Sequence, residues 1–117
     1  MIEYPLYTFS VILESSFTSL GCWKDNSIRS IDGYEGVKGI QGCFERAKAL
    51  GYDVFAVQYR GQCFTTATAG ETYKKYGPSN GCSASGTGGA WANEVYKIHK
   101  IGKNSSNFIC GNSLCFI

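Results

Sequence analysis

The stretch from Val37 to Cys63 decides the fold, and it reads VKGIQGCFERAKALGYDVFAVQYRGQC. From Val37 to Leu50, apolar residues recur every three or four positions with polar residues between them, which is typical of an amphipathic helix. Gly51 follows at the point where helices often end in a left-handed glycine. The segment from Tyr52 to Tyr59, which is largely apolar, then predicts a strand that is buried on at least one side. The helix is therefore expected to cover this strand.

Shorter elements follow along the chain. Gly61 predicts a turn, and residues 62–66 continue in an extended conformation. Thr68 to Tyr76 predicts one short helix, Ser79 to Gly89 a long loop of glycine and serine, and Trp91 to Ile98 a last strand. This order predicts a small α+β domain in which an antiparallel sheet packs against one main helix.

Composition narrows the classes of partner. The chain has 117 residues, of which 44% are hydrophobic, so it can form about one domain with one core. Its 11 Lys and Arg against 9 Asp and Glu give a net charge of +2, which is too small to attract nucleic acid or an anionic membrane. No apolar run approaches the roughly 20 residues that span a bilayer. We therefore expect no nucleic-acid partner and no membrane span.

The six cysteines indicate an oxidising compartment. They form no C-x-x-C pair and the chain has one His, so a zinc site would need four thiolates at an unusual spacing. Cys43 lies on the predicted buried face of the helix and Cys63 just past the strand, so the two can meet if the helix packs antiparallel to the strand. A disulfide-stabilised, extracellular or cell-surface domain is the expected outcome.

The two ends of the chain read differently from its middle. Residues 1–19 are interpreted as a degenerate signal peptide or a disordered lead, because Glu3 precedes the apolar run and no Lys or Arg charges the start. The alternative is a first strand from Tyr4 to Leu13. Residues 99–117 read as a polar linker and a small cysteine-containing tail, in which Asn104 begins a glycosylation sequence. Both ends are expected to contribute little to the core.

An ordered set of short motifs resembles the WSC domain. The motifs are Gly21-Cys22-Trp23-Lys24-Asp25, Arg29-Ser30-Ile31, a helix that carries Cys43, Gly51-Tyr52, and the run from Phe55 to Cys63. The segments from Tyr73 to Cys82 and from Gly88 to Tyr96 are similar to the variant form found in secreted animal proteins. The resemblance covers about residues 20–98, which we take as the domain. Ala47 and Thr65 stand where the family has a further cysteine pair, as loss of one disulfide would leave them.

The resemblance implies a fold akin to PAN/apple modules and an extracellular role in binding carbohydrate. It also indicates how the six cysteines pair. The expected disulfides are Cys43 with Cys63, Cys22 with Cys82, and, outside the matched region, Cys110 with Cys115.

The candidate ligand-binding residues combine aromatic rings with neutral amides. They are Tyr59, Gln62, Tyr73, Tyr76, Trp91 and Asn93. Sugars stack the apolar faces of their rings on aromatic side chains, while their hydroxyls pair with amides. Trp91 and Asn93 share one face of the predicted last strand, beside the glycine loop. The alternative for each aromatic residue is that it fills the core.

The expected function is non-catalytic binding of a cell-surface or matrix polysaccharide. Because the net charge is only +2, this binding should be insensitive to salt. The alternative is a disulfide-rich structural or defence-type secreted protein whose surface binds another extracellular protein. An exposed row of aromatics beside amides would favour the glycan, and a broad apolar patch would favour the protein partner.

The charged side chains do not suggest a catalytic set. The lone His99 lies past the last predicted strand among lysines, and the carboxylates are scattered along the chain. Asp25 and Arg29 either pair across the first turn or stand as solvated surface charges. Gly86 to Gly89 lacks the lysine of a phosphate-binding loop and is interpreted as a flexible loop. We expect no enzymatic activity, no cofactor and no metal site.

Overall fold

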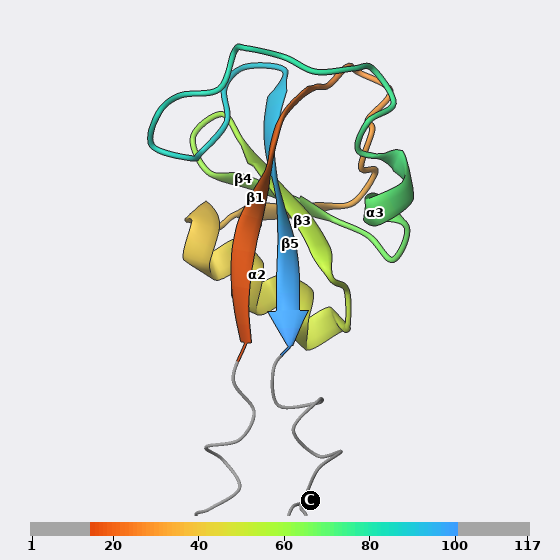
Figure 1. The fold of residues 1–117 in the computed structure, drawn as a ribbon, viewed down its shortest axis with the longest axis vertical. Coiled ribbons are helices and arrows are strands. Elements are labelled where there is room, and N and C mark those ends of the chain that lie inside the picture. The colour runs from red at the N-terminus through yellow and green to blue at the C-terminus, as the bar shows by residue number, and fades with distance from the viewer. Residues whose placement is uncertain (1–14, 101–117) are drawn as a thin grey trace, which may run out of the picture. The chain divides into compact units, whose positions relative to one another are not determined.

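The computed structural model of this chain describes residues 15–100, and its main compact unit spans Phe17–Ile98. In chain order the elements are β1 (Ser15–Lys24), β2 (Tyr34–Val37), α2 (Gly39–Leu50), β3 (Val54–Gln58), β4 (Gln62–Thr65), α3 (Ala69–Thr72) and β5 (Ala92–Lys100). The strands form one sheet in the order β1-β5-β3-β4-β2. The pairings of β5 with β3, β3 with β4 and β4 with β2 are antiparallel, and β1 runs beside β5 in the opposite direction (Figure 1). The predicted α+β class is confirmed.

Helix α2 covers one face of the sheet, as the spacing of its apolar residues predicted. Its buried residues Cys43, Phe44 and Ala47 pack against Phe55 and Val57 of β3. Burying an aromatic or branched side chain contributes about 1.5 to 3 kcal/mol each, so this contact is a main source of stability.

The helix ends where the sequence predicted and begins later. Gly51 has a φ of 81°, and its N–H donates a hydrogen bond to the carbonyl of Lys48 at 3.0 Å. The helix begins at Gly39 rather than at the expected Val37, because Val37 is the last residue of β2 and pairs with Gln62. Strand β2 has only four residues, which is too short to show an alternating pattern in the sequence.

A second layer covers the opposite face of the sheet. The buried residues that pack together there include Val54 and Ala56 of β3, Val95 of β5, Ile31 from the loop after β1, and Ala69 of α3. Because both faces are covered, every residue of β3 is buried. This explains the apolar run from Val54 to Val57 in its sequence.

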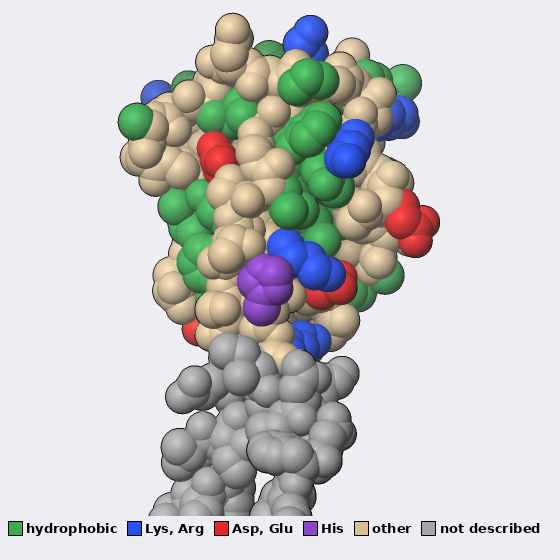
Figure 2. All heavy atoms as spheres, viewed as in Figure 1, with side chains coloured by type: hydrophobic (Ala, Val, Ile, Leu, Met, Phe, Trp, Pro, Cys, Tyr) green, Lys and Arg blue, Asp and Glu red, His purple; other side chains and the backbone are tan. Residues whose placement is uncertain are grey.

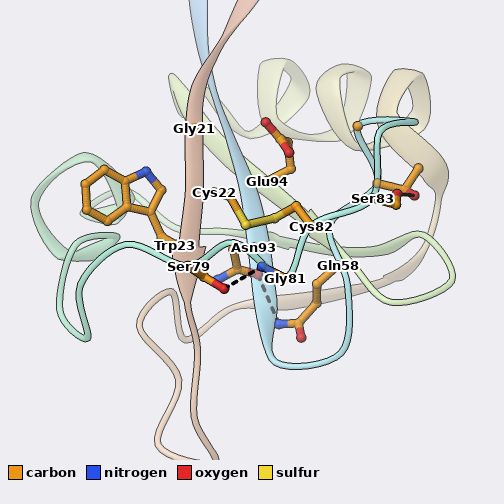
Figure 3. Close-up of a disulfide and its surroundings, with 12 residues drawn as sticks. Gly21, Cys22, Trp23, Gln58, Ser79, Gly81, Cys82, Ser83, Asn93 and Glu94 are labelled. Atoms are coloured by element: carbon orange, nitrogen blue, oxygen red, sulfur yellow. Dashed lines mark hydrogen bonds between the residues drawn. A yellow bond between two sulfur atoms is a disulfide. The ribbon is translucent and has the colours of Figure 1, made fainter.

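Two disulfides cross-link the described residues. Cys43 joins Cys63 and ties α2 to β4, with the two Cα atoms 5.4 Å apart. Cys22 joins Cys82 and ties β1 to the loop before β5, with the Cα atoms 6.0 Å apart (Figure 3). Both expected pairings are confirmed. The expected pairing of Cys110 with Cys115 lies outside the described residues.

The domain starts earlier than the sequence suggested. Strand β1 begins ahead of the expected domain start at residue 20. The ring of Phe17 lies 4.6 Å from Phe44, 5.6 Å from Phe55 and 5.4 Å from Tyr96, measured between ring centroids. The expectation that the residues before 20 contribute little to the core is therefore wrong at Phe17. The glycosylation sequence at Asn104 and the alternative strand from residue 4 to 13 lie outside the described residues.

The segment between β4 and β5 contains less helix and closer packing than predicted. Helix α3 spans only Ala69–Thr72, and turns follow up to Tyr76. In the long loop, Gly88 has a φ of 70°, and a Cβ added to it would lie 2.3 Å from the carbonyl oxygen of Val57. The interpretation of Gly86 to Gly89 as a simply flexible loop is wrong at Gly88, because its close approach to β3 leaves room only for glycine.

Candidate ligand-binding site

A hollow of about 230 Å³ lies at the end of the sheet where β3 turns into β4 and β5 begins. Its lining residues are Arg29, Gln58, Tyr59, Gln62, Ala90 and Trp91. We call it the Trp91 hollow. The two aromatic residues that line it remain open to solvent, since Trp91 is 52% exposed and Tyr59 is 46% exposed. The structure thus brings together three residues of the predicted site: Tyr59, Gln62 and Trp91.

Both of these aromatic residues stand on unusual backbone. Tyr59 has a φ of 22° and Trp91 a φ of 55°; Arg60 is the one other non-glycine residue with positive φ among residues 15–100. Such conformations typically cost about 1 to 3 kcal/mol each and persist only where the surrounding structure enforces them. Strained residues of this kind tend to cluster at binding sites. The position of both rings at one hollow therefore marks it as the candidate site.

The buried carboxylate of Asp25 connects the segments around the hollow. Its Oδ1 accepts a hydrogen bond from the backbone N–H of Ser30 at 2.9 Å. Its Oδ2 accepts from Nη1 of Arg29 at 2.9 Å and from Nε2 of Gln58 at 2.7 Å. The backbone N–H of Asp25 donates to the carbonyl of Trp91 at 3.0 Å. One residue thus links the loop after β1, the end of β3 and the start of β5.

The same hydrogen bonds keep Asp25 ionised. Burial on its own would raise the pKa of the Asp25 carboxyl. Hydrogen bonds that favour the charged form outweigh burial and hold this pKa below its ordinary value; they come from Ser30, Arg29, Asn26 and Gln58. Asp25 and Arg29 are therefore an ion pair, and of the two alternatives drawn from the sequence the paired one is correct.

Asn93 supports the hollow from inside the protein. It is 0% exposed, its Oδ1 accepts a hydrogen bond from Nε2 of Gln58 at 3.0 Å (Figure 3), and its Nδ2 donates to Oγ of Ser30 at 3.3 Å. The prediction that Asn93 shares an exposed face with Trp91 is wrong. The left-handed backbone at Trp91 interrupts the alternation, so the two side chains do not share the direction that a continuous strand would give them. Asn93 is a supporting residue rather than a ligand contact.

Arg29 lies between aromatic rings at the edge of the hollow. The central carbon of its guanidinium is 4.8 Å from the centre of the Trp91 ring and 5.0 Å from that of Phe64. Contacts of a cation with an aromatic face are worth about 0.5 to 2 kcal/mol, depending on their exposure to water. Together with the ion pair to Asp25, they fix the guanidinium in place.

A second hollow of about 300 Å³ adjoins the first. Its lining residues are Arg29, Asp32, Tyr34, Gln62 and Phe64. Arg29 and Gln62 line both hollows, so the two share a wall. Tyr34 adds a third exposed aromatic ring, and it lies beside Phe64 with 5.3 Å between ring centroids. We call this the Tyr34 hollow.

Two residues of the predicted site lie elsewhere. Tyr73 packs edge-on against Trp23 with 5.3 Å between ring centroids, as part of the core under α3. The hydroxyl of Tyr76 donates a hydrogen bond to the carbonyl of Ile28. Neither tyrosine lines either hollow. The prediction that they join the binding surface is therefore not supported, because α3 ends before them and the turns direct them to other partners.

Sequence reasoning missed Gln58, Tyr34 and the role of Arg29 in this site. Gln58 carries a usable signal, since it is the one polar residue within the apolar strand β3 and every residue of that strand is buried. A buried amide must find hydrogen-bond partners, so a polar residue in such a strand predicts a network. Tyr34 carries no comparable signal, because it stands in the short strand that the sequence did not reveal.

Other kinds of site are not found in the part of the chain that the structure describes. Residues 15–100 contain no cluster of three His, Cys, Asp or Glu side chains that could hold a metal ion. Within the same residues, no helix is long and apolar enough to cross a membrane. On the face seen in Figure 2, basic, acidic and hydrophobic side chains are interspersed. The two hollows are therefore the candidate sites among the described residues.

Comparison with known proteins adds no relative. No protein-family model, no curated protein and no solved structure matches this chain significantly.

Proposed function

We propose that this protein is a non-catalytic module that binds a neutral glycan in the Trp91 hollow. One observation carries the proposal: two exposed aromatic rings, Trp91 and Tyr59, are held on strained backbone beside a hollow lined with amide side chains. A sugar presents an apolar face that stacks on such rings and hydroxyls that pair with amides. The Asp25 network fixes the polar side of the hollow before any ligand arrives, which lowers the entropic cost of binding.

The surroundings of the hollow support a neutral ligand. The positive charge of Arg29 is already balanced by Asp25, and the chain as a whole carries a net charge of only +2. Long-range attraction of an anion would be small under these conditions. We therefore expect binding that changes little with ionic strength, in contrast to binding that depends on charge.

An extracellular setting and a WSC-like identity belong to the same proposal. Two disulfides are compatible with an oxidising extracellular environment. The ordered motifs between Gly21 and Tyr96 resemble the WSC domain, and that resemblance implies a PAN/apple-like module with a glycan of a cell surface or matrix as its partner.

A protein partner is the second candidate. The large hydrophobic residues that are exposed in the described part of the chain are Ile28, Tyr34, Val37, Tyr59 and Trp91. Trp, Tyr and Arg dominate the energetics of protein interfaces, so this set could bind a protein. However, Arg29 and Gln62 stand between the two hollows and interrupt the apolar surface. A surface of separated rings and polar groups suits a sugar better than an apolar partner.

Retention on immobilised neutral polysaccharides tests the proposal. The oxidised full-length chain should be retained, and Trp91→Ala should lose at least tenfold in affinity because a stacking platform is removed. Val37→Ala is the matched control, since Val37 is exposed but lines neither hollow. It should bind like the wild type. Failure of the wild type to bind any polysaccharide, or equal losses in both variants, would contradict the proposal and favour the protein partner.

A further inference from the structure

The amide of Gln58 is buried, but part of it faces the Trp91 hollow. Gln58 is 2% exposed and yet lines the hollow. Its Nε2 donates one hydrogen bond to the carboxylate of Asp25 and one to Oδ1 of Asn93. A primary amide nitrogen carries two hydrogens, so both are in use.

The amide oxygen of Gln58 has no hydrogen-bond partner among the residues that the structure describes. Oε1 accepts no hydrogen bond from residues 15–100. Every fully buried side-chain nitrogen or oxygen among those residues has a hydrogen-bond partner, so Oε1 is not fully buried. It must therefore be accessible to solvent, and the hollow is the space that Gln58 lines. In Figure 3 this oxygen points away from Asn93. Oε1 of Gln58 is thus an acceptor that can form a hydrogen bond with a ligand.

The orientation of this amide is fixed by charge. Turning the amide over would place Oε1 against the ionised carboxylate of Asp25, where two acceptors would face each other. It would also leave the bond to Asn93 unmade. Because both losses occur in a buried site, the reversed orientation is strongly disfavoured. The side-chain amide of Gln58 therefore offers an acceptor to the hollow and does not rotate to offer its NH₂ group instead.

A donor lies on the same hollow. Arg29 lines it, and its guanidinium lies over the ring of Trp91. The bond to Asp25 engages Nη1. A guanidinium has five N–H groups in a planar fork, so others remain for a ligand. The hollow thus offers one fixed acceptor, from Gln58, and donors from Arg29, with the rings of Trp91 and Tyr59 beside them.

We propose that the Trp91 hollow recognises a pair of neighbouring hydroxyl groups on an uncharged sugar ring, one donating to Oε1 of Gln58 and the other accepting from Arg29. This deepens the proposed function and rests on it. Gln58 is then the residue that sets specificity. A carboxylate or sulfate group has no hydrogen to donate at neutral pH, so its oxygens would lie against Oε1 without a bond. The hollow therefore rejects acidic sugars at this position.

The first test varies the ligand and leaves the protein unchanged. The oxidised full-length chain is titrated with a neutral glycan that it retains and with versions that lack, O-methylate or O-sulfate single ring hydroxyls. At the hydroxyl that donates to Oε1 of Gln58, each of these changes should weaken binding at least tenfold, because it removes the hydrogen and leaves the buried acceptor unpaired. Removal of the neighbouring hydroxyl should also weaken binding, because the guanidinium of Arg29 then loses its acceptor.

The outcomes of this test separate the two proposals. Indifference to every single ring hydroxyl, or equal or tighter binding of every O-sulfated form, overturns the recognition of a hydroxyl pair while sugar binding itself stands. Absence of binding to every neutral glycan overturns the proposed function as well. Losses of affinity on changing two neighbouring hydroxyls support both.

A second test assigns the role to Gln58. Gln58→Met keeps a side chain of similar length and removes the acceptor, and Gln41→Met is the matched control, because Gln41 is exposed on α2 and lines neither hollow. In the Gln58→Met variant the deoxy and parent glycans should bind equally, whereas Gln41→Met should keep the discrimination. Retained discrimination in a folded Gln58→Met variant overturns the assignment. If that variant does not fold, the ligand series on the wild-type protein decides the matter.

Discussion

Nε2 of Gln58 lies 2.7 Å from Oδ2 of Asp25, and this hydrogen bond joins the end of β3 to the loop after β1. The same nitrogen donates to Asn93 on β5 at 3.0 Å. Three segments that are far apart in the sequence therefore meet in one polar network beneath the candidate site. Only Asp25 and Arg29 in this network are charged. The ionised carboxylate of Asp25 accepts from Nε2 of Gln58 and thereby fixes the orientation of that amide. The geometry of the hollow therefore depends on the charge of Asp25.

Asp25→Asn should destabilise the protein at neutral pH. The substitution replaces an oxygen that accepts hydrogen bonds with an NH₂ group that faces other donors. Such a loss of hydrogen bonds in a buried site typically costs about 1 to 3 kcal/mol. The pKa of Asp25 is lower in the folded protein than its ordinary value, so the contribution of the ionised form is present above about pH 4 and is lost as the pH falls through the folded pKa. Urea unfolding between pH 7 and pH 3 measures the free energy of unfolding of both proteins. The difference between the wild type and Asp25→Asn should become smaller as the pH falls.

Asp32→Asn is the control for this prediction. Asp32 is exposed, so its replacement should change the free energy of unfolding by no more than about 0.5 kcal/mol. Equal stability of wild type and Asp25→Asn at pH 7 would show that the Asp25 network contributes nothing to the fold.

Phe17→Ala should destabilise the protein by about 2 to 3 kcal/mol, somewhat less than the loss of a fully buried Phe because Phe17 is only half-buried. The ring closes the aromatic cluster between α2 and the sheet. For the same reason, a fragment of residues 20–98 should unfold at lower urea concentration than one of residues 15–100. Thermal and urea unfolding of both fragments gives the comparison, and equal midpoints would argue against a role for β1 residues before 20.

The main helix, the central strand and the disulfide of Cys43 with Cys63 could be predicted because local patterns determine them, whereas the pairing of Cys22 with Cys82 was expected from the resemblance to the WSC domain. The apolar spacing in α2 and the apolar run from Val54 to Val57 in β3 lie within short stretches of the chain, so each element can be recognised in the sequence. Cys43 lies within α2, and Cys63 lies in β4, the strand that follows β3 in the chain. Phe17 escaped notice because it stands among serines and threonines, and its burial comes from distant partners.

The site could be predicted only in part. Residue types suggested Trp91, Tyr59 and Gln62, since exposed aromatics and amides suit a sugar. Alternation along β5 grouped Trp91 with Asn93, but it reveals neither a left-handed residue at the start of a strand nor which face a loop will cover. Gln58 acquires its role from Asp25, which lies 33 positions away in the sequence. No local pattern encodes such a contact.

Mild reduction should open the disulfide of Cys22 with Cys82 before that of Cys43 with Cys63. Cys43 and Cys63 are fully buried in the core, whereas Cys22 and Cys82 are only partly buried, and a thiol must reach the sulfur that it attacks. Alkylation of the released thiols followed by peptide mapping identifies the order. Simultaneous loss of both bonds would instead indicate that reduction requires global unfolding.

Removal of the outer disulfide should also loosen the loop that leads to Trp91. Cys22→Ser with Cys82→Ser opens a link across 60 residues, which contributes about 4 kcal/mol in the chain-entropy model. Because Cys82 lies in the loop before β5, the variant should lose glycan affinity even at temperatures where it remains folded. Unchanged affinity in the folded variant would show that the Asp25 network alone positions the hollow.

Trp91→Gly and Trp91→Ala together separate binding from strain. Trp91 is half-exposed, so its replacement should cost little packing, and both variants should remain folded. At a φ of 55°, glycine has no steric strain, whereas the Cβ of alanine does. Trp91→Gly should therefore be more stable than Trp91→Ala by about 1 kcal/mol, despite the larger entropy of its unfolded chain. Both variants lose the ring and should lose retention on polysaccharide alike. Thermal unfolding and retention measured on the same samples give both readouts. A Trp91→Gly variant less stable than Trp91→Ala would mean that Trp91 does not adopt the left-handed conformation in solution, and retained binding in either variant would remove its ring from the site.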